Sequence, residues 1–193
     1  MVKGVRRSKS KLAGGIELFS ENTITFLETR GDLARMVSTR LEAHWDGMIG
    51  DLPRMMFGYE AMKLLDKIVE DEAERSYYEL LKSTLQALAD LENPEPAVEV
   101  WFYMRLLKWQ GHEPNLKTDQ HGAKLEDQQL YTFSFDDMCF SQSSQGSYRA
   151  EHIKFLRLIA LHKIEVMKQV QNVDAITKEL QPLLKQLVNQ QLI

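Results

Sequence analysis

Residues 94–114, PEPAVEVWFYMRLLKWQGHEP, hold the segment on which the predicted fold depends. Pro94 and Pro96 suit the first turn of a helix, because proline has a helical φ and the N–H that it lacks would have no partner there. Gly111 followed by Pro114 is typical of a helix end. Between these signals, apolar side chains cover most sides of the helix. A helix without a polar face belongs in the centre of a protein, so we predict a helical fold built around this segment.

Apolar side chains also recur at helical spacing before and after the central segment. The two faces predicted before it consist of Met55, Tyr59, Met62 and Ile68, and of Tyr77, Leu81, Leu85 and Leu88. The two faces predicted after it consist of Ile153, Leu156, Ala160 and Ile164, and of Ile176, Leu180, Leu184 and Leu187. This spacing is that of amphipathic helices, so two helices are expected on each side of the central one.

The first 40 residues predict β structure instead. Ile16–Phe19 and Ile24–Leu27 are short apolar runs rich in strand-forming residues, and the polar Ser20–Asn22 lies between them. This pattern predicts a hairpin that turns at residues 20–22. Two or three strands cannot bury a sheet face by themselves, so the segment either packs on a partner surface or is an incomplete sheet.

A polar stretch, residues 115–147, follows the central helix. Within it, the alternating run Leu130–Phe135 predicts a strand, and Leu125 marks the other strand of a possible hairpin. The sequence SQSSQGS over 141–147 predicts a flexible link to the next helix.

The composition is that of an ordinary soluble globular protein, with 44% hydrophobic and 27% charged residues in a chain of 193. No apolar stretch is long enough to span a membrane, and no apolar core of a secretory signal follows the basic start, so we expect a cytoplasmic protein. The single cysteine, Cys139, excludes an intramolecular disulfide and a four-cysteine zinc site.

Positive charge is concentrated at the start of the chain. Residues 1–11 contain five basic and no acidic residues, whereas the remaining residues contain 19 basic and 28 acidic ones. Each cation that neutralises a phosphate releases counterions, which gives affinity for nucleic acid with little sequence preference. We therefore predict DNA or RNA binding through Lys3, Arg6, Arg7, Lys9 and Lys11. The alternative is a solvated, frayed terminus that merely carries charge.

No group of residues predicts catalysis or a metal site. The five histidines are scattered, and the chain has no H-E-x-x-H, no G-x-S-x-G and no glycine loop for phosphate. Asp136 and Asp137 are adjacent, and neighbours in a strand point to opposite faces, so they make a poor acid–base pair. His121 and Cys139 could meet in the polar stretch, but two ligands do not complete a structural zinc site. We therefore expect a protein that is not an enzyme and that has no cofactor.

The order of these elements resembles the RecO family of bacterial DNA repair and recombination mediators, from about Lys3 to about Cys139. The resemblance depends on Lys3-Gly4-Val5-Arg6-Arg7 with Lys9-Ser10-Lys11, Leu18-Phe19-Ser20, Gly31-Asp32-Leu33, Tyr59-Glu60-Ala61 with Leu64-Leu65-Asp66, and Phe102-x-x-Arg105-Leu106-Leu107 followed by Gly111 and Pro114-x-Leu116. Each piece is weak, and their common order and spacing make the match specific.

This resemblance implies a mainly α fold with a small β part. Residues 1–45 would be the late strands of a partial OB-fold, and residues 46–193 a helical domain with a degenerate zinc-finger-like insertion at 115–147. It also implies a non-enzymatic mediator that binds single- and double-stranded DNA and promotes strand annealing. Such a protein would work with RecR, dock the C-terminal tail of the single-stranded DNA-binding protein and help to load RecA. No membrane partner is implied.

The chain departs from the family pattern in two places. The basic K-G-x-R-R piece lies late in the family's barrel, so Met1 would follow the first strands, and either the chain is partial or the barrel is reduced. Where many members have C-x-x-C-G and a later C-x-x-C, this chain has Thr118-x-x-His121-Gly122 and Cys139-x-x-Gln142. We therefore predict that no zinc binds and that Tyr131, Phe133 and Phe135 hold the insertion together. The competing hypothesis is a helical protein-interaction module that has lost DNA binding.

Overall fold

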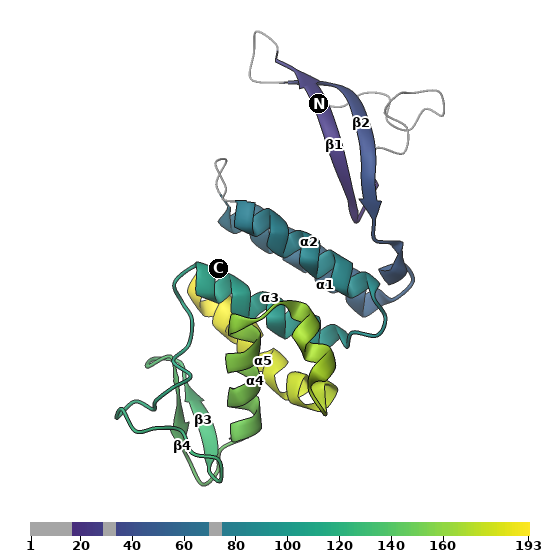
Figure 1. The fold of residues 1–193 in the computed structure, drawn as a ribbon. Coiled ribbons are helices and arrows are strands. Elements are labelled where there is room, and N and C mark those ends of the chain that lie inside the picture. Colours follow the sequence, from purple (N-terminus) through teal and green to yellow (C-terminus); the bar gives the residue numbers. More distant parts are fainter. Residues whose placement is uncertain (1–16, 29–33, 70–74) are drawn as a thin grey trace.

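The structure, a computed structural model, describes residues 17–28, 34–69 and 75–193 (Figure 1). The α-helices within these ranges are α1 (Leu52–Ile68), α2 (Arg75–Ala89), α3 (Glu95–Trp109), α4 (Ala150–Leu161) and α5 (Val173–Leu192). The strands are β1 (Ser20–Leu27), β2 (Arg35–His44), β3 (Leu130–Ser134), β4 (Cys139–Gln142) and β5 (Tyr148–Arg149), and the two 3₁₀-helices are η1 (Asp46–Met48) and η2 (Ile164–Gln169). The prediction of a mainly α fold with a small β part is confirmed.

Helix α3 is the centre of the molecule, as its sequence predicts. Ten of its residues are buried, and it contacts α1, α2, α4 and α5. Its first turn follows Pro94, and the chain leaves it at Gly111, whose φ of +77° suits glycine. Phe57 of α1 packs edge to face against Phe102 and Tyr103 of α3, with ring centroids 5.7 Å apart in both pairs. The core is therefore built around this helix from all sides.

The faces predicted for α2, α4 and α5 are largely confirmed. Leu85 and Leu88 of α2 are buried, and Tyr77 and Leu81 lie at the edge of the core. Every predicted core residue of the last two helices is less than 8% exposed, although Ile164 belongs to η2 rather than to α4. Among the described residues, no helix has the length and apolar character needed to cross a membrane.

The face predicted for α1 is wrong. Its buried side is formed by Arg54, Phe57, Gly58, Ala61, Leu64 and Leu65. The predicted residues Met55 and Met62 are only partly buried, and Tyr59 is 42% exposed. Helix α1 has apolar residues around most of its circumference, so its sequence offers two stripes at helical spacing, and contact with α2 and α3 determines which one is buried.

The N-terminal hairpin turns at a different place from the one predicted. Strands β1 and β2 pair antiparallel from Ser20 opposite His44 to Leu27 opposite Arg35. Residues 20–22, the predicted turn, are therefore strand residues, and Ile16 lies outside the described residues. The chain bends instead at Phe19, whose φ is +53° and whose side chain is 3% exposed in the helical core. Because the Phe19 side chain is buried against the helices, this residue is not part of strand β1.

The insertion forms a three-stranded sheet in the order β4-β3-β5. The predicted pairing of 130–135 with Leu125 is wrong, because β3 pairs with β4 on one side and with β5 on the other. Ser141 and Gln142, which we expected in the flexible link, belong to β4. Phe133 lies opposite Phe140, and both side chains are buried. The apolar partner of β3 is thus the strand that follows it in the sequence.

Candidate functional site

The cations predicted to bind nucleic acid, Lys3, Arg6, Arg7, Lys9 and Lys11, all lie outside the described residues. The structure therefore does not test this prediction.

Many cations of the described part of the chain are already held by carboxylates. The pairs at 3.1 Å or less are Arg40–Glu42, Lys82–Glu21, Lys154–Asp127, Lys168–Asp90, Lys168–Glu92, Lys178–Asp174 and Lys185–Glu60. A phosphate would have to compete with these carboxylates for each cation. Residues 1–11 contain no carboxylate in their sequence, which distinguishes this segment from the rest of the chain.

One face of the N-terminal hairpin carries large apolar side chains that are open to solvent. Ile24 pairs with Thr39, Phe26 with Met36, and Asn22 with Leu41, so these six side chains share one face. Ile24, Phe26 and Leu41 are 46%, 57% and 49% exposed. An OB-fold barrel has five strands, and the described residues provide two at this end of the molecule. The partial OB-fold therefore remains a prediction.

The hairpin is fastened to the helices at its base. Glu21 of β1 accepts hydrogen bonds from the Tyr78 hydroxyl and from Lys82 Nζ, both on α2. These two donors lower the pKa of Glu21, and the same contact raises the pKa of Lys82. Beside them, the ring of Phe19 packs edge to face against Tyr59, 5.2 Å between centroids. A Cβ at Gly58 would lie 2.8 Å from the Phe19 ring, so a larger residue at this position on α1 would force the ring to shift.

A hollow with an apolar floor and a basic rim lies where α3 and α4 end beside the start of the insertion. It has a volume of about 520 Å³ and is lined by Lys108, Glu113, Pro114, Asn115, Leu116, Lys117, Arg157, Ala160 and Leu161. Leu161 is 71% exposed at its edge, although it is a large apolar side chain. Apolar surface surrounded by cations suits a ligand that combines apolar and acidic groups.

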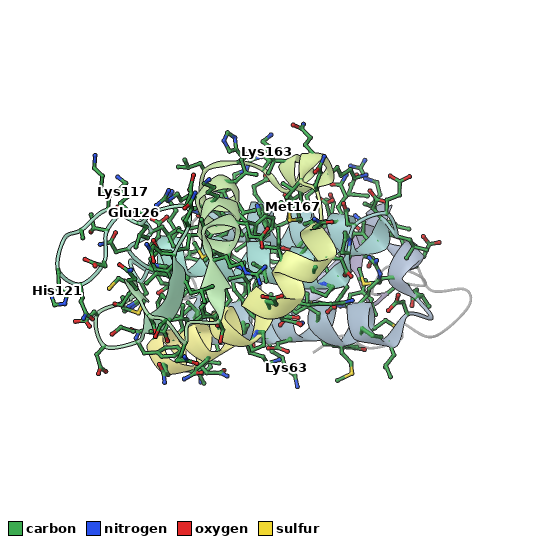
Figure 2. All side chains as sticks on the ribbon, turned by 90° about the horizontal axis from the view of Figure 1, so that it is seen from below. Lys63, Lys117, His121, Glu126, Lys163 and Met167 are labelled. Atoms are coloured by element: carbon green, nitrogen blue, oxygen red, sulfur yellow. The ribbon has the colours of Figure 1, made fainter. Side chains whose placement is uncertain are left out.

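Hydrogen bonds fix two of the three cations on the rim of this hollow. Arg157 Nε donates to the Leu116 carbonyl at 2.7 Å, and Lys108 Nζ donates to the Ala160 carbonyl at 3.1 Å. The only carboxylate in the lining, Glu113, lies 3.9 Å from Lys108. Lys117 points away from the molecule (Figure 2). With three cations and one carboxylate, the rim carries a net positive charge within an otherwise acidic protein.

The sequence did not predict this hollow. Its cations and Leu161 come from three segments up to about fifty positions apart, so no local spacing relates them. The sequence feature that could have indicated this surface is Leu161, a large apolar residue next to His162 at the end of an amphipathic helix.

The insertion does not assemble a metal site from its described residues. Cys139 is buried in β4, where burial raises the pKa of its thiol, while His121 is exposed on the outer loop beside Gln120 (Figure 2). Throughout ranges 17–28, 34–69 and 75–193, no cluster of three or more potential ligands is found. Asp136 and Asp137 are exposed, and Asp137 accepts a hydrogen bond from Ser134, as expected for a surface turn.

A buried carboxylate cluster joins α1, α3 and α5. Glu99 is 4% exposed, and burial raises its pKa although Gln181 donates a hydrogen bond to it. Nearby, Glu60 accepts hydrogen bonds from Tyr103 at 2.7 Å and from Lys185 at 3.1 Å. These contacts tie three helices together, with Glu99 buried among them and Glu60 and Lys185 at the surface.

Comparisons with known proteins point to one family. A family model described as "Recombination protein O C terminal" matches residues 49–192. The DNA repair protein RecO of Roseiflexus sp. (strain RS-1) is 31% identical over 120 residues, 60% of this chain and 41% of that protein. The RecO proteins of Bifidobacterium longum subsp. infantis and Rhodopirellula baltica are each 29% identical over 61% and 59% of this chain, and 50% and 43% of their own lengths. The chain thus matches half or less of each of these relatives.

Proposed function

Because the chain belongs to the RecO family, we propose that it acts in DNA repair and homologous recombination as a mediator rather than as an enzyme. The observation that carries this proposal is the family match over residues 49–192, which includes the five described α-helices and the insertion. RecO proteins are named for DNA repair, so the role proposed for this chain is that of its relatives.

The proposed DNA contact is electrostatic and involves Lys3, Arg6, Arg7, Lys9 and Lys11. Cations that neutralise phosphates also reduce the repulsion between two strands, which favours the pairing of complementary strands. The charge pattern of the sequence supports this assignment, because the first eleven residues contain five cations and no carboxylate, whereas the remaining residues contain more acidic than basic side chains.

The experiment that tests this proposal measures the binding of labelled single-stranded DNA over a series of salt concentrations. Reversing Arg6 and Arg7 to glutamate is expected to weaken binding by at least about tenfold at low salt, for every sequence tested. Losing two phosphate contacts should also reduce the slope of log K against log salt by about 1.4.

Reversing Lys154 and Lys178 provides a control with the same change in net charge at two lysines that carboxylates already hold. This control should retain most of the affinity. Binding that ignores salt, or that falls equally in both variants, would refute the assignment of the phosphate contacts to the N-terminal segment.

For the partners of the family, we propose that the basic-rimmed hollow takes the acidic C-terminal tail of the single-stranded DNA-binding protein. Its lining offers Leu116 and Leu161 to apolar side chains, and Lys108, Lys117 and Arg157 add positive charge around them. In this way the chain would join coated single strands and, with RecR, help to load RecA.

We expect the double substitution Lys117→Glu with Leu161→Glu to weaken binding of a synthetic acidic tail peptide by about tenfold or more. Isothermal titration with the whole chain measures this effect. The matched control is Lys163→Glu, an exposed lysine outside the lining (Figure 2). Equal affinity of the double variant and the control would exclude this hollow as the site.

A second candidate function is a helical protein-interaction module that has lost DNA binding, which the ion pairs of the body favour. It predicts that removing residues 1–16, which leaves the core residue Phe19 in place, changes no partner binding. It also predicts that the intact chain does not bind single-stranded DNA, so the salt series distinguishes the two functions.

A further inference from the structure

Glu99 of α3 is an acidic side chain enclosed between helices, on the side of α3 against which α5 packs. It is 4% exposed, and its oxygen Oε2 accepts a hydrogen bond from Gln181 of α5 at 2.5 Å. The other oxygen, Oε1, is buried as well and has no hydrogen-bond partner among the described residues. An ionised carboxylate needs donors at both oxygens, and an unpaired charge in a closed space is costly. The surroundings of Glu99 therefore suit the protonated acid.

The Tyr103 hydroxyl, one turn further along α3, does not supply the missing donor. It donates its single proton to Glu60 at 2.7 Å. Burial raises the pKa of Tyr103, and the neighbouring Glu99 and Glu60 raise it further, so the hydroxyl retains this proton. Its oxygen can still accept a hydrogen bond, and it lies close enough to Glu99 to interact with it. A protonated Glu99 can donate to this oxygen, whereas an ionised one cannot.

The charged side chains that face Glu99 do not compensate an ionised carboxylate. Glu95, one turn earlier on α3, and Glu60 on α1 both repel it. Lys185 of α5 is a cation that faces it, but its ammonium group donates to Glu60 at 3.1 Å, and the Lys185 side chain is 49% exposed. Loss of solvation outweighs the favourable contacts, so burial raises the pKa of Glu99.

We propose that a proton on Glu99 determines how firmly α5 is docked on α3, which makes α5 a pH-sensitive element of the fold. With the proton, Glu99 donates to the Tyr103 oxygen and still accepts from Gln181, so both of its oxygens have partners. Without the proton, a negative charge remains in the contact between the two helices. Pro182, beside Gln181, has no N–H and interrupts the hydrogen bonds of α5 at this point, so α5 is the helix that yields.

The direction of the pH dependence follows from the raised pKa of Glu99. The folded protein holds the Glu99 proton more tightly than the unfolded chain, in which a glutamate has a pKa of about 4.3. The stabilisation by this proton is therefore complete below that value and is lost as the pH rises through the pKa of the folded state. The docking of α5 is thus expected to be firm in mild acid and to loosen in mild alkali.

Thermal unfolding of the whole chain from about pH 5 to about pH 8.5 tests the proposal. Glu99→Gln keeps the shape of the side chain without its charge. It should raise the melting temperature at the alkaline end by about 4 °C or more, and change it little at the acidic end. The matched control is Glu165→Gln, which removes a charge from an exposed side chain and should shift the whole profile by less than about 1 °C. A Glu99→Gln profile that runs parallel to that of the unaltered chain overturns the proposal.

Hydrogen exchange locates the effect in α5. At about pH 8.5, amides of α5 should exchange at least about threefold more slowly in Glu99→Gln than in the unaltered chain, while those of β3 should exchange at the same rate. Equal slowing in both elements would show that Glu99 does not act on α5 in particular, which overturns the proposal. If Glu99→Gln does not fold, the carbon-13 signal of the Glu99 carboxyl in the unaltered chain decides. A titration midpoint at or below about 4.3 overturns the proposal, and a higher one supports it.

Discussion

Replacing Arg54 by alanine is expected to lower the free energy of unfolding by about 3–5 kcal/mol. The Arg54 side chain is 8% exposed and reaches from α1 into the connection between α2 and α3. There its guanidinium donates to the carbonyls of Leu88 at 2.9 Å and Asn93 at 2.7 Å. Alanine would leave these buried carbonyls without donors at the end of a helix, where orphaned carbonyls are costly.

Urea denaturation measured by far-ultraviolet circular dichroism checks this expectation. Arg40→Ala is the matched control, because Arg40 is 76% exposed and pairs with Glu42 in solvent. That change should cost no more than about 1 kcal/mol. Arg54→Lys should fall between the two, since an ammonium cannot donate in the same fork. A loss below about 1 kcal/mol in Arg54→Ala would show that the carbonyls find water instead.

The second large effect is expected from Phe140→Ala, which should destabilise the protein by about 3–5 kcal/mol. Phe140 is fully buried in β4, with ring centroids 5.0 Å from Phe133 and 5.5 Å from Tyr148. The rings of Phe133, Phe140 and Tyr148 pack against one another, and the substitution removes the centre of that packing.

Hydrogen exchange of β3 and β4, together with thermal unfolding, measures this effect. Leu130→Ala is a control within the same sheet, at a side chain that is 38% exposed, and should cost less than about 1 kcal/mol. We also expect a chelator to leave the melting temperature of the unaltered chain unchanged. A drop in melting temperature with chelator would show that a metal does stabilise the insertion.

The candidate sites differ in whether a local sequence pattern can predict them. The basic segment can be recognised in the sequence because its five cations are neighbours, although its position stays outside the described residues. The hollow cannot be recognised in this way, because Lys108, Arg157 and Leu161 become neighbours only when α3 and α4 pack together. The same is true of Glu21, which looks like a turn residue until Tyr78 and Lys82 are placed beside it.

The sequence by itself determined the helices, the central place of α3 and the family. Helical periodicity, proline starts and glycine ends are relations between residues a few positions apart, so each segment contains them without help from the others. Only the tertiary structure decided which face of α1 is buried, where β1 begins and which strand pairs with β3. Those choices depend on contacts between separate elements, such as Phe19 with α1 and Phe133 of β3 with Phe140 of β4. No local pattern expresses the free energy of such contacts.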